Sequence, residues 1–280
     1  MRLIEVLYAF LMGVVEGITE WLPVSSTGHM ILLDRLFTLD FSAAFTELFL
    51  VVIQLGAILA VLVYFFNRLN PFSTRKTADE KKQTYRLWGK VIVGMLPAMV
   101  AGVLLKVVYG SIPDNPFLIA AALILYGVLF IVIERRQKHR TYRVNTTDEL
   151  SYKDALLIGL FQALSIIPGT SRSGSTIIGG MLMGVSRTVA AEFTFFMAIP
   201  VMAGASLIEV LGFVKDGVSL SGTEIGALII GIVVSFLVSL LVIRFLMDFV
   251  KRHSFEVFGW YRIALGAVVI VVFSILRAVA

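Results

Sequence analysis

Long apolar stretches separated by short polar segments dominate the hydropathy pattern of the chain. Six of these stretches carry no Asp, Glu, Lys or Arg, and they reach the ~20 residues of a membrane-spanning helix once their flanks are included. They are Leu48–Asn67, Val91–Leu105, Phe117–Ile133, Phe193–Ile208, Ile225–Ile243 and Ile263–Leu276. The pattern predicts an all-α polytopic membrane protein with six transmembrane helices.

Two further apolar segments, Tyr8–Leu33 and Ala155–Val185, are interrupted near their middle by polar residues, proline and glycine. Each has the pattern of a helix, an irregular loop and a second helix. Irregular backbone at membrane depth is stable only where protein or a water-filled cavity satisfies its polar groups. We therefore expect two re-entrant helical hairpins in addition to the six spans.

A shift of 146 residues superimposes the two interrupted segments without a gap. Three pairs of positions are then identical: Gly13 and Gly159, Ser25 and Ser171, Gly28 and Gly174. Because an odd number of spans separates the two copies, they enter the membrane from opposite sides. We predict an inverted-topology repeat, with copies of about residues 1–134 and 150–280 inside a single integral membrane domain, 1–280.

Composition supports a membrane protein and narrows its chemistry. Hydrophobic residues make up 58% of the chain and charged residues 15%, with a mean hydropathy of +0.92, whereas soluble domains carry about 25% charged residues. A soluble enzyme and a disordered chain are thereby excluded. The absence of cysteine excludes disulfides, thiolate catalysis and cysteine-bound metals. The net charge is +5, but the basic residues lie in loops, so we expect contact with bilayer lipids and no nucleic-acid partner.

The distribution of Lys and Arg predicts how the chain crosses the membrane. Seventeen of the 24 lie in three segments, Arg68–Lys90, Arg135–Lys153 and Arg244–Arg262, which the positive-inside rule places in the cytoplasm. The connections around residues 106–116 and 213–224 hold one each and are expected outside, together with both chain termini. Glutamates interrupt the first apolar stretch and no small-residue cleavage site follows it, so no signal peptide is expected.

Glu16 and Glu20 are one helical turn apart, so both project from the same face of the first half-helix. Two carboxylates are costly in hydrocarbon, by a few kcal/mol each. They predict a site for a hard cation, or one carboxylate as metal ligand and the other as general base. Alternatively, both reach the outer interface or pair with arginine.

Ser25, Ser26, Thr27 and His29 supply three hydroxyls and an imidazole just after these carboxylates. A hydroxyl needs a nearby base to become a nucleophile, and His29 or Glu20 can serve if the loop folds back. The alternative is a helix cap formed by the hydroxyls, with an ordinary interfacial histidine.

The second interrupted segment contains Pro168-Gly-Thr-Ser-Arg-Ser-Gly-Ser-Thr176. Glycines, hydroxyls and a helix N-terminus suit an anion, and the planar fork of Arg172 suits phosphate oxygens. Alternatively, Arg172 pairs with Glu16 or Glu20 and joins the hairpins. The expected phosphate-binding residues are Ser25, Thr27, Ser171, Arg172, Ser173, Gly174 and Thr176.

Acidic, hydroxyl, imidazole and guanidinium groups on two facing loops together indicate phosphoryl transfer on a lipid substrate. Gln54 and Glu192, near the starts of long spans, are expected to support the hairpins through hydrogen bonds. The competing class is a transporter or flippase of an anionic lipid, because inverted repeats with broken helices are typical of carriers. A carrier needs an anion site but no nucleophile.

Glu16-Gly-Ile-Thr-Glu-Trp-Leu-Pro-Val-Ser-Ser-Thr-Gly-His29 and Pro168-Gly-Thr-Ser-Arg-Ser-Gly174 resemble the two signature motifs of the bacterial undecaprenyl-diphosphate phosphatase (bacitracin-resistance protein) family. The resemblance covers nearly the whole chain. It implies an enzyme of the bacterial plasma membrane that hydrolyses undecaprenyl diphosphate to undecaprenyl phosphate for cell-wall synthesis, with resistance to bacitracin. It also implies a divalent cation, Mg²⁺ or Ca²⁺, and a site that faces the outer side.

By position, the acidic motif of that family falls on Glu16 and Glu20, its serine–histidine motif on Ser25, Ser26 and His29, and its arginine on Arg172. Our hypothesis is that Ser26 attacks the outer phosphorus, assisted by His29 or Glu20, while Arg172 and a cation held by Glu16 and Glu20 stabilise charge. His29 or metal-bound water as nucleophile stays open. A homo-oligomer is compatible with the sequence, which does not fix the oligomeric state.

Overall fold

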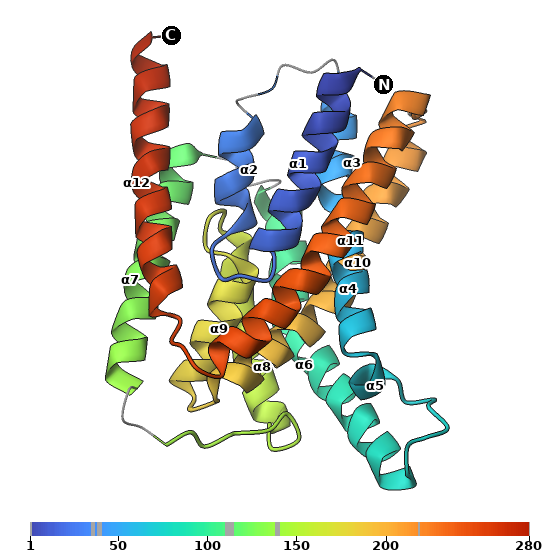
Figure 1. Cartoon of the computed structure of the whole chain (residues 1–280), viewed down its shortest axis with the longest axis vertical. Coiled ribbons are helices and arrows are strands. Elements are labelled where there is room, and N and C mark those ends of the chain that lie inside the picture. The colour runs from blue at the N-terminus through green and yellow to red at the C-terminus, as the bar shows by residue number, and fades with distance from the viewer. Residues whose placement is uncertain are drawn as a thin grey trace.

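The computed structural model describes residues 2–34, 37, 41–109, 115–137, 141–217 and 219–279. These residues form helices (Figure 1), and their only β-type pairing is one isolated bridge between Val144 and Val185. The helices are α1 (Leu3–Thr19), α2 (Ser26–Asp34), α3 (Ala43–Val52), α4 (Gln54–Tyr64), α5 (Phe66–Leu69), α6 (Ala78–Tyr109), α7 (Pro116–Gln137), α8 (Tyr152–Ala163), the 3₁₀ turn η1 (Leu164–Ile166), α9 (Arg172–Leu182), α10 (Arg187–Lys215), α11 (Gly222–Val250) and α12 (Glu256–Val279).

Six helical segments are long and apolar enough to cross a membrane, in agreement with the sequence prediction. They are Ala44–Tyr64, Ala78–Leu105, Pro116–Gln137, Arg187–Lys215, Gly222–Val250 and Glu256–Ala278. The predicted outer connection at 106–116 includes residues 110–114, which lie outside the described residues, and the basic segment 135–153 includes residues 138–140, which do so as well.

Two of the predicted spans differ in extent from the helices. The span predicted at Leu48–Asn67 is two helices, α3 and α4, with a local break at Ile53, and α4 ends at Tyr64. The span predicted at Val91–Leu105 is the middle of the longer α6. The extension is helical because Thr77 and Glu80 cap it reciprocally: the Glu80 carboxylate accepts from the Thr77 N–H at 2.7 Å and the Thr77 hydroxyl accepts from the Glu80 N–H at 3.3 Å.

Two helix–loop–helix hairpins enter the molecule from opposite ends, and their loops lie side by side near its middle (Figure 1). The first hairpin consists of α1 and α2, and the second of α8 and α9. The first residues of α1 and the last residues of α12 lie at the same end of the molecule (Figure 1).

Glycines on the first helix of each hairpin allow a neighbouring span to approach closely. A Cβ atom on Gly13 in α1 would lie 2.8 Å from the carbonyl oxygen of Gly231 in α11. A Cβ atom on Gly159 in α8 would lie 2.1 Å from that of Gly94 in α6. Small residues at such contacts bring helix backbones together, so each hairpin is braced by one long span.

Apolar contacts fix the tip of the first hairpin to the core. The Trp21 ring is fully buried and meets the Phe195 ring of α10 edge-to-face, with centroids 5.0 Å apart. Phe193 and Phe196 of the same helix are also fully buried. The core of α10 thereby places the polar residues that follow Trp21 against the second hairpin.

Candidate functional site

A cavity of about 210 Å³ lies where the two hairpin loops meet. Both loops contribute polar side chains, and α4 and α10 close the remaining walls. The lining residues are Glu20, Ser25, Ser26, Thr27, Gln54, Ser165, Pro168, Gly169, Ser171, Arg172, Val201, Met202 and Ala205. Residues 25–27 and 171–172 therefore meet in space as the sequence predicted, although about 145 positions separate them in the chain.

An ion pair between Glu20 and Arg172 joins the hairpins across this cavity. The Arg172 Nη2 and Glu20 Oε1 atoms are 2.7 Å apart, and the two side chains are only 12% and 11% exposed. Glu20 caps the carboxyl end of α1, while Arg172 is the first residue of α9. A guanidinium forms its strongest hydrogen bonds with anionic oxygens. A phosphate that enters the cavity would therefore compete with Glu20 for Arg172.

Ser26 lies on the other side of the same carboxylate. Its hydroxyl Oγ is 3.5 Å from Glu20 Oε2, a long contact for an O–H donor. Ser26 begins α2, so its side chain stands at a helix N-terminus that faces the cavity. Glu20 is therefore placed to orient or deprotonate the Ser26 hydroxyl while its second oxygen is held by Arg172.

The residues that precede α2 and α9 share an unusual backbone conformation. Ser25 has φ 73° and Ser171 has φ 68°, and within the described chain they are the only non-glycine residues with positive φ. This left-handed conformation costs serine of order 1–3 kcal/mol, and such strain concentrates at ligand-binding loops. Ser25 is buried and its hydroxyl has no hydrogen-bond partner among the described residues, which leaves it available to a ligand in the cavity.

Arg262 of α12 holds the two loops together. Its guanidinium is fully buried and donates to the carbonyl oxygens of Pro23 at 3.1 Å, Gly169 at 2.9 Å and Thr170 at 3.0 Å. It also lies over the Tyr126 ring, 5.4 Å from the centroid. No carboxylate pairs with it in the described part of the chain. The distribution of basic residues predicts Arg262 in a cytoplasmic loop; that prediction is wrong, because the helix of the last span begins before it, at Glu256.

His29 lies on α2 and makes no hydrogen bond to Ser26 or Glu20 in the described structure. Its Nδ1 is 2.8 Å from the Ser25 carbonyl oxygen, and its Nε2 is 2.6 Å from the Tyr261 hydroxyl. Because a carbonyl only accepts, Nδ1 carries the proton and, in the neutral ring, Nε2 accepts from Tyr261. The two rings stack with centroids 5.6 Å apart. The assistance to Ser26 predicted for His29 is not seen in this arrangement.

Glu16 is fully buried, and neither of its carboxylate oxygens has a hydrogen-bond partner among the described residues. It lies within electrostatic range of both Glu20 and Arg172. An unpartnered buried carboxylate fits a cation, because Mg²⁺ is commonly held by one or two carboxylates and by phosphate oxygens of the substrate. No group of three or more acidic or histidine side chains converges in the described chain, so the protein ligands here would be Glu16 and Glu20.

Three of the expected phosphate-binding residues lie in the first turns of α9, next to the second loop, and do not line the cavity. The Ser173 hydroxyl donates to the Leu22 carbonyl at 3.3 Å, and the Gly174 N–H donates to the Ser171 hydroxyl at 3.2 Å. Thr176 donates to the carbonyl of Arg172 at 3.0 Å and accepts from Thr194 at 2.7 Å. Each therefore fixes the loop whose other residues reach the cavity.

The two expected supporting residues have different positions. Gln54 begins α4 and lines the cavity, as a supporting residue would. Glu192 lies in the second turn of α10, near Arg68 and Lys251, and makes no hydrogen bond to either hairpin in the described structure. Its expected supporting hydrogen bond therefore stays a prediction, and the first turns of α10 lie near the basic residues Arg68 and Lys251 rather than at the cavity.

Comparison with known proteins places these residues in a family. The family model described as "Bacitracin resistance protein BacA" matches residues 9–268. An undecaprenyl-diphosphatase of Enterococcus faecalis is 53% identical over 97% of this chain and 98% of its own. That of Desulfitobacterium hafniense is 52% identical over 98% of both chains, and undecaprenyl-diphosphatase 1 of Clostridioides difficile is 53% identical over 98% of both.

Proposed function

Because the chain belongs to the bacitracin resistance protein BacA family, we propose that the cavity between its hairpins is the active site of a lipid diphosphatase. The chain is a multi-pass membrane enzyme that hydrolyses undecaprenyl diphosphate to undecaprenyl phosphate and phosphate. This reaction recycles the carrier lipid of cell-wall synthesis and confers resistance to bacitracin. The assignment of the site depends on one observation above all: Glu20, Ser26 and Arg172, from two hairpins, surround a single cavity.

Ser26 is the proposed nucleophile. Its hydroxyl oxygen forms a bond to the outer phosphorus, the bond from that phosphorus to the bridging oxygen breaks, and undecaprenyl phosphate leaves. Glu20 takes the hydroxyl proton, since its free oxygen faces Ser26. Water then cleaves the phosphoserine and releases phosphate. The hydroxyls of Thr27 and Ser171 line the cavity and contact the phosphate oxygens.

Arg172 supplies positive charge to the phosphate in this proposal. Its guanidinium fork exchanges the Glu20 oxygen for phosphate oxygens, so the substrate frees Glu20 to act as a base. His29 as nucleophile is the less supported variant, because its Nε2 contacts Tyr261.

Glu16 and Glu20 would hold a divalent cation, Mg²⁺ or Ca²⁺, beside the phosphate. The two unpartnered, buried oxygens of Glu16 support this assignment. When bound, the cation neutralises phosphate charge and lowers the repulsion between the two carboxylates.

An inverted-topology repeat of two re-entrant hairpins is our interpretation of the architecture. Several features recur at the shift of 146 residues. These are the left-handed serines Ser25 and Ser171, the close-contact glycines Gly13 and Gly159, and the buried unpartnered side chains Glu16 and Gln162. The left-handed serines support the interpretation most strongly, because non-glycine residues seldom adopt that conformation.

We infer that the enzyme lies in the bacterial plasma membrane with the cavity accessible from the outer side. The basic segments gather at the end of the molecule opposite its termini, and the positive-inside rule assigns that end to the cytoplasm. The substrate headgroup would then enter the cavity from the outer leaflet while its polyprenyl chain stays in hydrocarbon.

A flippase of the same lipid phosphate is the second candidate function, favoured by the recurrence of features between the two halves. Phosphate release distinguishes the two. Purified protein in detergent has no gradient and no two sides, so only an enzyme releases phosphate from undecaprenyl diphosphate there. We expect turnover in this assay; its absence in folded, cation-supplied protein would favour the flippase.

A further inference from the structure

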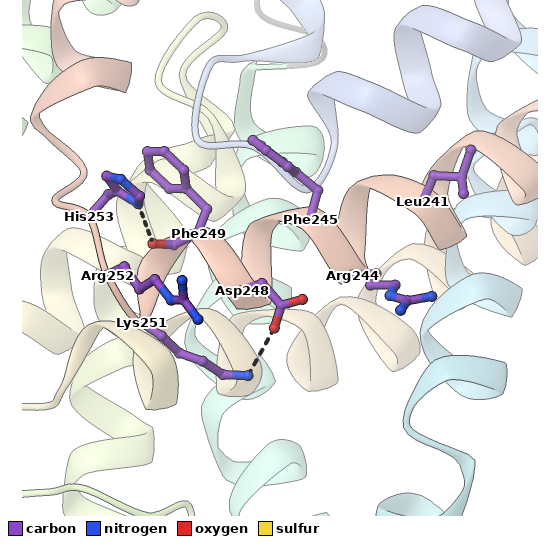
Figure 2. A pocket seen from close by; sticks show the side chains of 8 residues that line it. All are labelled: Leu241, Arg244, Phe245, Asp248, Phe249, Lys251, Arg252 and His253. Carbon is purple, nitrogen blue, oxygen red and sulfur yellow. Dashed lines mark hydrogen bonds and ion pairs between the residues drawn. The ribbon is translucent and has the colours of Figure 1, made fainter.

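An open groove of about 680 Å³ follows the carboxyl-terminal turns of α11, away from the catalytic cavity (Figure 2). Its volume is in the range of small-molecule sites. The groove is lined by Leu241, Arg244, Phe245, Asp248, Phe249, Lys251, Arg252 and His253. Figure 2 shows the four charged side chains along one side of the helix and Phe245, Phe249 and His253 along the other.

The groove lies on the face of α11 that is directed away from the protein core. Leu241 is 71% exposed and Phe245 is 57% exposed. Residues between them and after them, Ile243, Leu246 and Val250, are buried in the core. Because α11 is one of the helices long and apolar enough to cross a membrane, the exposed apolar residues face lipid chains.

The charged part of the groove lies at headgroup level. With 29 residues, α11 is about 43 Å long, which exceeds the ~30 Å hydrocarbon core of a bilayer. Arg244 lies within the last two turns of α11, and Lys251 and Arg252 directly follow Val250, the last residue of that helix. Lysine and arginine near a helix end extend toward the interface, so Lys251 and Arg252 mark the headgroup end of the groove, and Arg244 extends toward that end from about two turns deeper.

Two of the cations in the groove have no partner among the residues that the structure describes. Lys251 pairs with Asp248 at 3.0 Å. Arg244 and Arg252 make no side-chain hydrogen bond or ion pair within the described part of the chain, whereas Arg68, Arg143 and Arg187 at the same end are paired with carboxylates. Two unpaired guanidinium forks, with net positive charge around them, match the oxygens of a phosphate diester.

We propose that this groove binds one anionic phospholipid, with its phosphate on Arg244 and Arg252 and an acyl chain along Leu241 and Phe245. The apolar half of the groove selects a lipid over a free phosphate ion. The net charge selects an anionic lipid such as phosphatidylglycerol over a zwitterionic one, because each basic residue near the membrane surface contributes about 1 kcal/mol toward anionic lipid.

The bound lipid would also brace the catalytic hairpin. α11 packs against α1, where a Cβ atom on Gly17 would lie 2.8 Å from Val238 Cβ. The Ser239 hydroxyl donates to the Gly17 carbonyl at 3.4 Å. Gly17 is adjacent to Glu16, so a lipid that immobilises the end of α11 restrains the helix that carries both carboxylates.

Native mass spectrometry of the full chain released from detergent tests the proposal by counting retained lipids. The probes are phosphatidylglycerol and phosphatidylcholine, each titrated into delipidated protein. We expect one phosphatidylglycerol to bind with clear preference, and Arg244→Gln with Arg252→Gln to weaken its binding roughly thirty-fold. The matched control, Arg75→Gln with Arg136→Gln, removes two exposed arginines at the same end for which the described residues offer no side-chain partner, and should bind like the wild type.

The proposal would be overturned if the wild type bound the two lipids equally. It would also be overturned if the Arg244/Arg252 variant bound phosphatidylglycerol as well as the wild type does. If that variant does not fold, competition experiments on the wild type still test the proposal. Added salt should weaken phosphatidylglycerol binding, and inorganic phosphate at matched ionic strength should displace no more lipid than chloride does. Full displacement by inorganic phosphate would identify a simple anion site and contradict the lipid site. Phosphate release in detergent is a separate readout, so failure of the catalytic proposal would be recognised independently.

Discussion

Glu20 Oε1 accepts a hydrogen bond from Arg172 at 2.7 Å, while Glu20 Oε2 lies 3.5 Å from the Ser26 hydroxyl. One carboxylate thus connects the proposed nucleophile of the first hairpin to the cation of the second. In the proposed mechanism, a phosphate that takes over Arg172 releases the carboxylate, so substrate binding and activation of Ser26 are linked.

Ser26→Ala should reduce phosphate release to near the uncatalysed rate, because it removes the attacking oxygen. Ser165→Ala is the matched control: Ser165 lines the same cavity, but its hydroxyl donates to the Gln162 carbonyl at 2.7 Å. We expect the control to keep activity within a few-fold of wild type. Acid quench of wild-type turnover should also trap a phosphoserine at Ser26. Substantial turnover by Ser26→Ala would move the nucleophile to His29 or to water.

Arg262→Gln should destabilise the protein and abolish activity, because three carbonyls from both loops lose their charged donor. A hydrogen bond from a charged group contributes about 1.5–3 kcal/mol, so a clear fall in the thermal unfolding temperature is expected. Arg262→Lys should recover part of the stability and less of the activity, since one ammonium does not reproduce the guanidinium fork. Arg277→Gln, exposed on the same helix, should change neither. A fully stable, active Arg262→Gln would show that the loops assemble without this contact.

Tyr261→Phe tests the position of His29. The change removes the hydroxyl that contacts His29 Nε2 at 2.6 Å but keeps the stacked ring. Loss of one hydrogen bond of about 1 kcal/mol predicts a roughly five-fold fall in kcat/KM. If His29 were the nucleophile, freeing Nε2 should instead raise activity. Steady-state kinetics at several substrate concentrations separate these outcomes.

Removal of divalent cations with a chelator should stop phosphate release, and Mg²⁺ or Ca²⁺ should restore it. Glu16→Gln should raise the cation concentration needed for half-maximal activity by at least ten-fold, because it removes one charged ligand. Glu47→Gln removes an exposed carboxylate on α3 and should leave the cation requirement unchanged. Activity that survives exhaustive chelation would contradict a cation held by Glu16 and Glu20.

Hydropathy sufficed to predict the six spans and the two interrupted segments, because the bilayer imposes length and apolarity on every crossing helix. The same physics explains why Ser26 and Arg172 could be assigned to one site: polar loops at membrane depth must satisfy one another or line a cavity. The break at Ile53 could not be predicted, since the sequence around it, residues 51–55, contains no proline or glycine.

The residues that hold the site were harder to identify. In the sequence, Arg262 looks like an ordinary residue beside a basic loop. Its role follows only from the structure, in which its buried guanidinium donates hydrogen bonds to the carbonyl oxygens of Pro23 and Thr170. The pairing of His29 with Tyr261 joins residues 232 positions apart and has no local pattern. The repeat does contain one signal for the burial of Glu16. The shift that superimposes Ser25 on Ser171 also aligns Glu16 with Gln162, and both of these side chains are fully buried.

The most direct test of the account is the rate of phosphate release from undecaprenyl diphosphate by purified wild-type and Arg172→Ala protein in detergent with Mg²⁺. The account predicts turnover by the wild type and a rate lower by about 10²–10³ for Arg172→Ala, since a charge-stabilising donor at the phosphate is lost. Both proteins should insert into the membrane, but the variant lacks the ion pair to Glu20 and should be less stable, so the two rates are compared per folded protein. A near-normal rate for Arg172→Ala would mean that the two hairpin loops do not form the phosphate site.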